Sequence, residues 1–250
     1  MKHYPFILFY LFLNLFIYAF QGTIWVYTFC FILFSAVVVW GSFDIQLGYF
    51  VNSFTHKRTR IKEIALTFDD GPTEFTPKFL DLLKEKNIKA TFFCIGKQIE
   101  KHPETFQRMI SEGHLIGNHT YSHSNNTGFL STQKMIKEIR KCDDAILNVG
   151  DIKTNLYRPP FGVTNPNIAK AIRKSHKKSI GWNVRSFDTV VNDEKKIMKK
   201  ITKKLKKGSV ILLHDTSEKT YTILVELLLF LERENYSTFT IPMIKSKNND

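Results

Sequence analysis

The stretch IALTFDDGP, residues 64–72, runs from an apolar segment into two adjacent carboxylates and a turn. A short apolar run that ends in turn residues is typical of a strand buried on both faces of a parallel sheet. Outward from it, short apolar runs alternate with longer amphipathic segments. The expected strands are 64–68, 90–95, 115–118, 156–158, 179–184, 210–214 and 238–242, and the expected helices are 77–86, 99–112, 132–147, 168–174, 194–205 and 221–234. This alternation predicts one α/β domain built on a parallel sheet.

Charged and polar side chains stand where the expected strands end. They are Asp69 and Asp70 after the first strand, His119 and His123 after the third, Arg158 at the end of the fourth, Asp188 after the fifth and His214 at the end of the sixth. Groups from all round the sheet can meet only if it curls, because the mouth of a barrel gathers the loops at the carboxyl ends of its strands. We therefore expect a distorted (β/α)7-type barrel, smaller than the eight-unit barrel, rather than an open doubly wound sheet.

The pair His119 and His123, four residues apart, would place both imidazoles on one face of a helical turn. Two imidazoles and one carboxylate make a catalytic zinc site with an open position for water. Asp70 is the candidate carboxylate, and as a ligand it would leave Asp69 free to take a proton from a water whose pKa the metal lowers. Position 120 is Thr, so the Glu of a metalloprotease helix is missing and proteolysis of that kind is disfavoured. Without a metal, Asp-Gly-Pro is only a turn signal.

His214 ends a buried apolar run, and Asp188 is available to orient and charge it. As imidazolium, His214 can protonate a leaving amine, and Arg158 is a further cation for the carboxylate pair. Base, metal, water and acid together describe the hydrolysis of an amide. Two His and one carboxylate also suit Fe(II), so a non-haem iron oxygenase is the competing interpretation, but Asp69, Arg158 and His214 would then lack roles.

Five motifs in this order resemble those of the polysaccharide deacetylases, the NodB-homology or carbohydrate esterase family 4 group. They are TFDDGP (67–72), HTYSH (119–123), RPPFG (158–162), WNVRSFD (182–188) and LLHD (212–215), and the resemblance covers about residues 64–241. It implies a distorted (β/α) barrel and metal-dependent removal of N-acetyl groups from N-acetylglucosamine-containing glycans, such as peptidoglycan or chitin-like oligosaccharides and polysaccharides. It also implies roles for single residues: Asp69 as base, Arg158 as its partner, Asp70, His119 and His123 as metal ligands, His214 as acid, Asp188 as the residue that tunes it, and the backbone N–H near Phe161 as an oxyanion donor. The implied metal is Zn²⁺, with Co²⁺, Ni²⁺ or Mn²⁺ as alternatives.

Two positions depart from the family pattern. Phe161 stands where Tyr is common, which is tolerable if only the backbone acts there. Arg185 stands where an acidic residue is frequent, and Thr189 where Trp is frequent. We therefore expect the cleft wall near Asp188, and the substrate preference, to differ from the pattern. An inactive carbohydrate-binding descendant is a third hypothesis, and retention of every catalytic position argues against it.

The first 54 residues form a segment of a different kind. The chain has 250 residues, 43% of them hydrophobic and 14% aromatic, which excludes a disordered protein, and it carries a formal net charge of +13. Only Lys2 and Asp44 are charged within residues 1–54, so the whole net positive charge of +13 belongs to the rest of the chain. Runs 4–20 and 23–43 have about the length that crosses a bilayer. We predict a membrane anchor over 1–54, with these two transmembrane helices, followed by a NodB-homology deacetylase domain over 55–250. A signal peptide is the alternative, but residues 19–22 offer no small-x-small cleavage site.

These features predict a monomeric integral membrane protein of a bacterial cytoplasmic membrane, held in membrane lipid by its hairpin and acting on an acetylated amino-sugar glycan. No nucleic-acid motif accompanies the positive charge, so a nucleic acid is not expected as a partner. Lys2, Lys57, Arg58 and Arg60 flank the hairpin on the side of the domain, so the positive-inside rule places the domain in the cytoplasm. Polymeric cell-wall substrates lie outside. Either the rule is overridden, or the substrate is a lipid-linked or soluble sugar at the inner face, as in the family's lipid-linked sugar deformylases.

Overall fold

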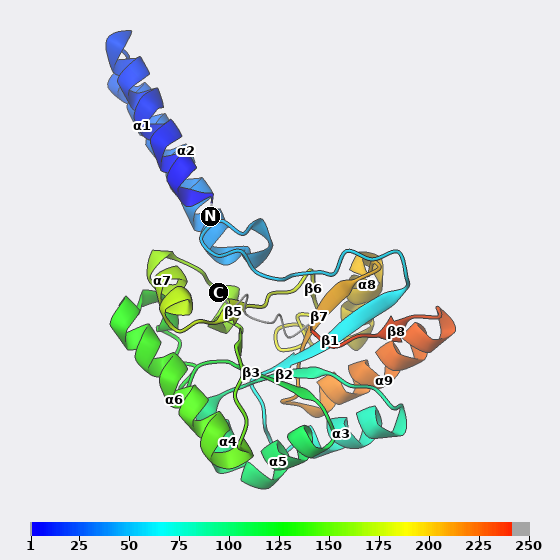
Figure 1. The fold of residues 1–250 in the computed structure, drawn as a ribbon. Helices are drawn as coiled ribbons and strands as arrows, with labels where there is room; N and C mark the ends of the chain where they lie inside the picture. Colours follow the sequence, from blue (N-terminus) through cyan, green and yellow to red (C-terminus); the bar gives the residue numbers. More distant parts are fainter. Residues whose placement is uncertain (1, 242–250) are drawn as a thin grey trace.

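The structure is a computed structural model that describes residues 2–241, in which a helical hairpin rises from an α/β domain (Figure 1). The strands are β1 (Glu63–Asp69), β2 (Thr91–Cys94), β3 (Leu115–Asn118), β4 (Leu156–Tyr157), β5 (Lys178–Ser179), β6 (Val184–Arg185), β7 (Ser209–His214) and β8 (Ser237–Thr238). The helices are α1 (His3–Ala19), α2 (Ile24–Phe43), α3 (Thr76–Glu85), α4 (Gly96–Lys101), α5 (Pro103–Ser111), α6 (Thr132–Gly150), α7 (Pro166–Lys174), α8 (Glu194–Lys204) and α9 (Glu218–Arg233), with short 3₁₀ helices η1 (Ile45–Leu47), η2 (Thr127–Phe129) and η3 (Pro160–Gly162). The ends of the expected strand 238–242 and of the expected domain 55–250 lie outside the described residues.

All the strands pair in parallel, in the order β5-β4-β3-β2-β1-β7-β6, with β8 beside β1. Within residues 2–241 no strand pairing joins β5 to β6, so the parallel sheet curls into a half-barrel, which confirms the predicted distorted barrel in part: the sheet curls but does not close. The expected strand 179–184 splits in two at this opening. The Ile180 N–H donates to the Tyr157 carbonyl at 2.8 Å and the Asn183 N–H to the Val210 carbonyl at 3.2 Å, so residues 180–183 carry the chain from one edge of the sheet to the other.

Side chains alternate between the two faces of the sheet, and this alternation determines which side chains of β1 face the site. Leu66 and Phe68 lie in the larger core between the sheet and its covering helices. Ala65 lies in the smaller core inside the curve of the sheet. Thr67 and Asp69 continue the Ala65 side of β1, because residues two apart in a strand share a face. The last residue of β1 therefore presents its carboxylate inside the half-barrel.

Most expected helices lie within a few residues of the observed ones. The expected helix 99–112 is divided into α4 and α5, because Pro103 cannot continue a helix through His102. The Ser131 hydroxyl caps α6 by accepting a hydrogen bond from the Lys134 N–H.

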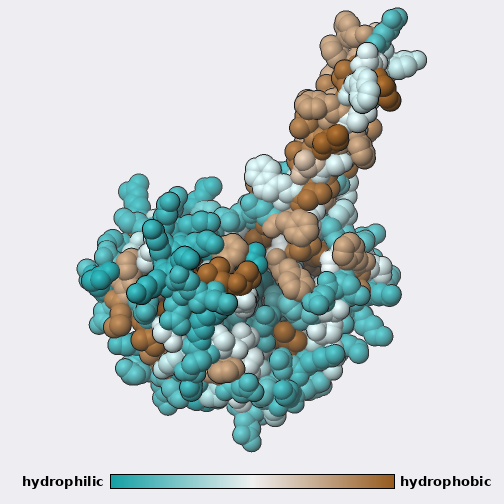
Figure 2. All heavy atoms as spheres, turned by 180° about the vertical axis from the view of Figure 1, so that it is seen from behind, coloured by the Kyte–Doolittle hydropathy of each residue, from teal (hydrophilic) through white to brown (hydrophobic). Residues whose placement is uncertain are grey.

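The N-terminal runs 4–20 and 23–43 do form two helices, packed as a hairpin. Phe34 of α2 stacks on Phe6 and Tyr10 of α1, with ring centroids 5.4 and 4.3 Å apart. Helix α2, with 20 residues, is long and apolar enough to cross a membrane by length and composition, whereas α1, with 17 residues, is shorter. Figure 2 shows the hairpin as a column of apolar side chains above a largely hydrophilic domain.

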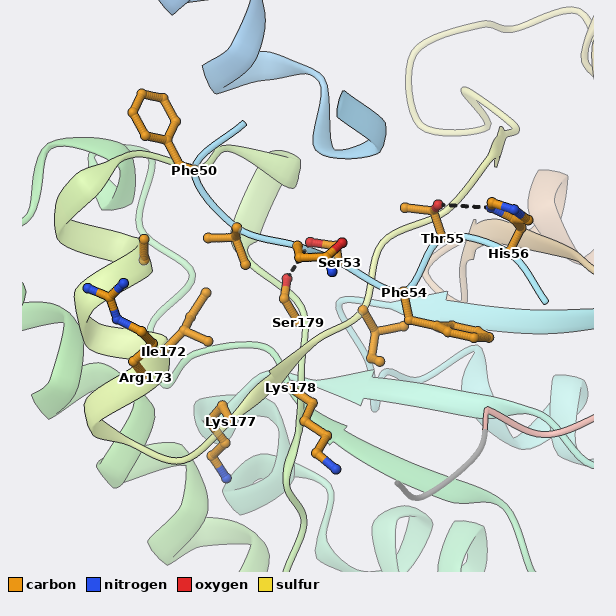
Figure 3. A pocket seen from close by; sticks show the side chains of 14 residues that line it. Phe50, Ser53, Phe54, Thr55, His56, Ile172, Arg173, Lys177, Lys178 and Ser179 are labelled. Atoms are coloured by element: carbon orange, nitrogen blue, oxygen red, sulfur yellow. Dashed lines mark hydrogen bonds between the residues drawn. The ribbon is translucent and has the colours of Figure 1, made fainter. Parts of the chain in front are cut away.

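The linker after the hairpin bonds to the edge strand β5 and, across the opening, to the residue that precedes β7, the neighbour of the edge strand β6. The Phe54 N–H donates to the Ser179 carbonyl at 2.9 Å, and the Lys57 N–H donates to the Gly208 carbonyl at 2.8 Å. The hydroxyl oxygens of Ser53 and Ser179 lie 2.7 Å apart, in a hollow of about 520 Å³ between the linker and the α7–β5 segment (Figure 3). These bonds attach the hairpin to the domain where the barrel fails to close.

Candidate active site

The carboxyl ends of four strands bring the predicted site residues together. In the sheet register Asp69 of β1 lies beside His214 of β7. His119 follows β3 directly and Arg158 follows β4, next to the paired residues Asn118 and Tyr157. Because the strands are parallel, all of these side chains lie at one edge of the sheet.

Asp70, His119 and His123 form a cluster that can hold a metal ion. Their ligand atoms all lie within 4.8 Å of one another. Asp70 Oδ1 is 3.5 Å from His119 Nε2 and 3.4 Å from His123 Nε2. Two ligands about 2.0–2.1 Å from a tetrahedral zinc lie about 3.3 Å apart, so these separations fit the ion with little movement.

Three further observations show that the donor set fits a divalent metal. Asp70 Oδ1 is buried and has no hydrogen-bond partner among the described residues. His119 Nδ1 lies 2.8 Å from the Arg158 carbonyl oxygen, which can only accept, so Nδ1 carries the proton and Nε2 keeps its lone pair. Burial, followed by the neighbouring His119, lowers the pKa of His123 and favours the neutral imidazole that binds metal.

The loop from His119 to His123 is not the helical turn that the spacing predicted. Thr120 and His123 have φ angles of 66° and 46°, in the left-handed region, so the histidines converge through a kinked loop. Asn118 holds this loop, because its side-chain oxygen accepts from the Thr120 N–H at 2.9 Å while its amide nitrogen donates to the Ile139 carbonyl at 2.8 Å. The two imidazole centroids lie 4.8 Å apart.

Asp69 is buried beside Arg158. An Arg158 guanidinium nitrogen (Nη1) donates to Asp69 Oδ1 at 2.7 Å and to the Thr67 hydroxyl at 2.9 Å. The other guanidinium nitrogens donate to the carbonyls of Ile180 and Gly181. Burial lowers the pKa of Arg158, but the Asp69 charge opposes this effect. With five donors fixed in one plane, Arg158 is pre-organised to hold the Asp69 carboxylate.

His214 pairs with Asp188, as the motif predicted. His214 Nδ1 lies 2.8 Å from Asp188 Oδ1, and the His214 N–H donates to Asp188 Oδ2 at 2.8 Å. Burial alone would lower the pKa of His214, but the hydrogen bond and charge of Asp188, followed by the charges of Asp69 and Asp70, raise it to about 9. Burial opposes ionisation of Asp188, yet the hydrogen bond from His214 leaves the pKa of Asp188 below its ordinary value. The imidazolium is therefore favoured at neutral pH.

Several supporting residues were not predicted. The hydroxyls of Ser186 and Thr220 donate to Asp188 at 2.7 and 3.0 Å. Behind the metal cluster, the fully buried Asp215 accepts from the Thr76 hydroxyl and packs against Gly71, where any Cβ would collide with its carboxylate. Ser186 and Asp215 lie inside two of the five motifs, so the sequence could have pointed to them. Thr220 lies on α9, outside the motifs, and nothing in the sequence around it indicates a role in the site.

Aromatic and basic side chains lie beside these groups. The Phe161 ring lies 4.8 Å from the His123 ring, and the Trp182 ring faces the Arg158 guanidinium at 5.5 Å. The Arg185 guanidinium lies 4.8 Å from the Phe187 ring, and Thr189 is exposed. The site thus combines three side chains that can hold a metal ion, a buried carboxylate held by a guanidinium, and an imidazolium. Together they can activate water against an amide and protonate the departing nitrogen.

Comparisons with known proteins agree with this arrangement. Residues 56–180 match the model of a family described as polysaccharide deacetylase. A peptidoglycan-N-acetylglucosamine deacetylase of Bacillus cereus is 39% identical over 155 residues, which cover 62% of this chain and 56% of that protein. The chain therefore spans little more than half the length of this curated relative.

Solved structures share the fold. A peptidoglycan N-acetylglucosamine deacetylase in complex with 4-naphthalen-1-yl-N-oxidanyl-benzamide superposes with a TM-score of 0.72 at 32% identity, over 78% of this chain and 93% of that one. A carbohydrate esterase family 4 pseudoenzyme from Bacillus anthracis, 23% identical, superposes with a TM-score of 0.69 over 75% of this chain and 66% of its own, which shows a common fold alone.

Proposed function

This chain belongs to the polysaccharide deacetylase family, and from that premise we propose that it is a metal-dependent hydrolase that removes N-acetyl groups from N-acetylglucosamine-containing glycans. The observation that carries the proposal is the convergence of the Asp70–His119–His123 cluster with the Asp69–Arg158 and Asp188–His214 pairs. Peptidoglycan is the substrate named for the B. cereus relative.

The metal ligands are Asp70, His119 and His123. A bound divalent ion, Zn²⁺ by this donor set, would polarise the amide carbonyl and lower the pKa of water. Asp69 Oδ2 lies 3.7 Å from His119 Nε2, beside the cluster but held away from it by Arg158. Asp69 is thus placed to accept the proton of the attacking water. Arg158 positions Asp69 and balances its charge.

His214 also lies beside the cluster, with Nε2 3.9 Å from Asp70 Oδ2. Its Nδ1 proton is held by Asp188, so Nε2 is the atom that donates a proton to the leaving amine. Phe161 has a φ of 59° and its ring lies 4.8 Å from the ring of His123, and its backbone N–H is the proposed oxyanion donor.

Acetate release tests this function. Full-length protein, stripped of metal and then loaded with Zn²⁺ or Fe²⁺, is incubated with peptidoglycan and with chitotetraose in the presence and absence of oxygen. We expect acetate from the Zn²⁺ form without oxygen, and none from a His119→Ala/His123→Ala double variant. Oxygen-dependent product from the Fe²⁺ form alone would support the oxygenase. Sugar binding without acetate release would support the inactive carbohydrate-binding protein.

We also propose that residues 1–54 anchor the enzyme in the cytoplasmic membrane, since α2 meets the length and composition of a membrane span and α1 packs along it. Two reporters fused after Asp250, one active only outside the cell and one only inside, test the side of the domain. The positive-inside rule predicts activity of the inside reporter. Activity of the outside reporter alone would show that the rule is overridden and that the wall polymer is accessible.

A further inference from the structure

A largely apolar groove runs from Phe161, whose ring lies beside that of His123, to the base of the hairpin. The groove has a volume of about 560 Å³. Its wall includes Ser42 and Phe43 at the end of α2, Phe129 of η2, and Phe161 and Val163 of the loop that follows Arg158. Three segments that are distant in the sequence therefore build one surface.

The groove exposes aromatic rings that the protein itself leaves uncovered. Phe129 is 92% exposed, Phe43 is 68% exposed and Phe161 is 45% exposed. Single exposed apolar side chains are ordinary, but a contiguous set beside a polar site marks a surface for a ligand or a membrane. The hollow of Figure 3 contains none of the converging site residues, so it is not an alternative location for the same ligand.

Of the three polar side chains that line the groove, those of Asn165 and Ser42 are already bonded to protein, and Asn125 is exposed. The Asn165 side chain accepts from the Ile168 N–H at 2.9 Å and donates to the Gly128 carbonyl at 2.7 Å. The Ser42 hydroxyl donates to the Val38 carbonyl at 3.0 Å. A hydroxyl-rich sugar chain would find few hydrogen-bond partners on these residues, whereas a hydrocarbon chain needs none.

Both ends of the groove are fixed. At one end the Phe161 ring lies 4.8 Å from the ring of His123 in the metal cluster. At the other end the Thr164 N–H donates to the Ser42 carbonyl at 2.9 Å, so the loop that carries Phe161 is bonded to the last turn of α2. The apolar surface of α2 continues through Phe43 into the groove, and Figure 2 shows apolar side chains where the column meets the domain.

We propose that this groove binds the hydrocarbon chain of a lipid-linked amino sugar, whose sugar then lies at the metal cluster. The inference rests on the proposed deacetylase function and narrows its substrate class. A chain that runs along α2 in the bilayer passes Phe43, reaches Phe129 and Phe161, and delivers its headgroup beside His123. The occupant is the substrate's own chain rather than a bilayer lipid, because only the substrate joins an apolar chain to a group that must reach the metal.

The test compares three soluble or micellar probes with full-length protein in one non-ionic detergent: the hexadecyl glycoside of N-acetylglucosamine, its methyl glycoside, and chitotetraose. We expect kcat/KM for acetate release from the hexadecyl glycoside to exceed that from the methyl glycoside by more than about tenfold, since burying a hydrocarbon chain is favourable. Phe129→Ala should reduce this ratio by about tenfold, whereas Phe129→Leu, which keeps an apolar side chain, should preserve most of it.

A matched control is Leu229→Ala on α9, which removes an apolar side chain that is 55% exposed and lies outside the groove. Partition into micelles concentrates the hexadecyl glycoside equally for every variant. The decisive measurement is therefore how the ratio of kcat/KM for the hexadecyl glycoside to kcat/KM for the methyl glycoside changes from one variant to another. Equal values for the hexadecyl and methyl glycosides, or a ratio that Phe129→Ala leaves unchanged, would overturn the lipid assignment and leave the deacetylase intact. A Phe129→Ala loss confined to chitotetraose would assign the groove to sugar and overturn it also. No acetate from any of these probes or from peptidoglycan would overturn the deacetylase and the lipid assignment together.

Discussion

Replacing Asp188 by Asn should move the pH at which activity is lost. Asp188 contacts His214 twice, through Nδ1 at 2.8 Å and through the backbone N–H at 2.8 Å. Asn keeps the shape and one acceptor oxygen, but it removes the negative charge and turns an amide NH₂ toward a donor. The variant therefore tests the charge of Asp188 with little change in packing.

The magnitude follows from the pKa of His214. Its rise from 6.5 to about 9 corresponds to about 3 kcal/mol in favour of the imidazolium. Asp188 supplies the largest raising effects, and burial lowers the pKa, so Asp188→Asn should bring it to about 6.5 or below. At pH 7.5 the acid form would fall from nearly all molecules to about a tenth or fewer, and kcat/KM would fall at least about tenfold.

The assay is kcat/KM for acetate release measured from about pH 5 to about pH 10, which reports groups of the free enzyme. The parent should lose activity as pH rises through about 9, whereas Asp188→Asn should lose it near or below neutrality. Stability should follow the same sign: the raised pKa of His214 contributes free energy of unfolding that is complete below 6.5 and is lost as pH rises to about 9. Asp151→Asn, at the exposed left-handed C-cap of α6, is the matched control and should change neither profile. An alkaline limb that stays near 9 in Asp188→Asn would refute the reasoning.

Three further substitutions probe the rest of the site. Asp69→Asn should retain bound metal and lose activity by about 10²–10⁴-fold, because the proton acceptor is gone; acetate release near the parent rate, with metal content measured in parallel, would exclude Asp69 as the base. Arg158→Met should lower the free energy of unfolding in urea by about 3–5 kcal/mol, because it leaves the Asp69 carboxylate buried without its partner, and a change below about 1 kcal/mol would contradict that dependence. Gly71→Ala should destabilise by about 1–3 kcal/mol, since its Cβ would collide with the Asp215 carboxylate, and adding Asp215→Ala should recover part of the loss in the same urea titration.

The local sequence pattern predicted most of the helices and strands, but it could not predict whether the sheet closes into a barrel. Strand β1 and its turn are visible in the sequence because apolar residues, two carboxylates and Gly-Pro follow one another. Nothing local distinguishes a strand that bonds to both edges of a sheet from a segment that crosses between them. Residues 180–183 cross, and the linker from Phe54 to Lys57 spans the opening through bonds to Ser179 and Gly208. The half-barrel thus depends on pairings between segments more than 100 residues apart, which apolar periodicity does not encode.

Site residues could be predicted from the sequence where a charged or polar side chain follows the end of a strand. The predicted residues around β1, β3, β4 and β7 meet in the structure because parallel register aligns the carboxyl ends. The predicted local geometry of His119 and His123 was wrong. A spacing of four residues suggests a helical turn and cannot reveal the positive φ angles of Thr120 and His123. Thr220 was missed because its hydroxyl reaches Asp188 across 32 residues of sequence.

The hairpin and the site are parts of one arrangement in this structure. The Lys2 N–H donates to the Tyr49 carbonyl at 3.1 Å, so the chain starts and leaves the hairpin at the end nearest the domain, as Figure 1 shows. The same end carries Phe43, which joins the apolar surface of α2 to the groove beside Phe161. If the basic flanks keep this end in the cytoplasm, the cross-linked wall polymer is out of reach, but a sugar carried on a lipid in the inner leaflet is not. The position of the groove therefore argues for a substrate that arrives from the membrane, and a cytoplasmic domain, which the charge of the flanks predicts, is compatible with such a substrate.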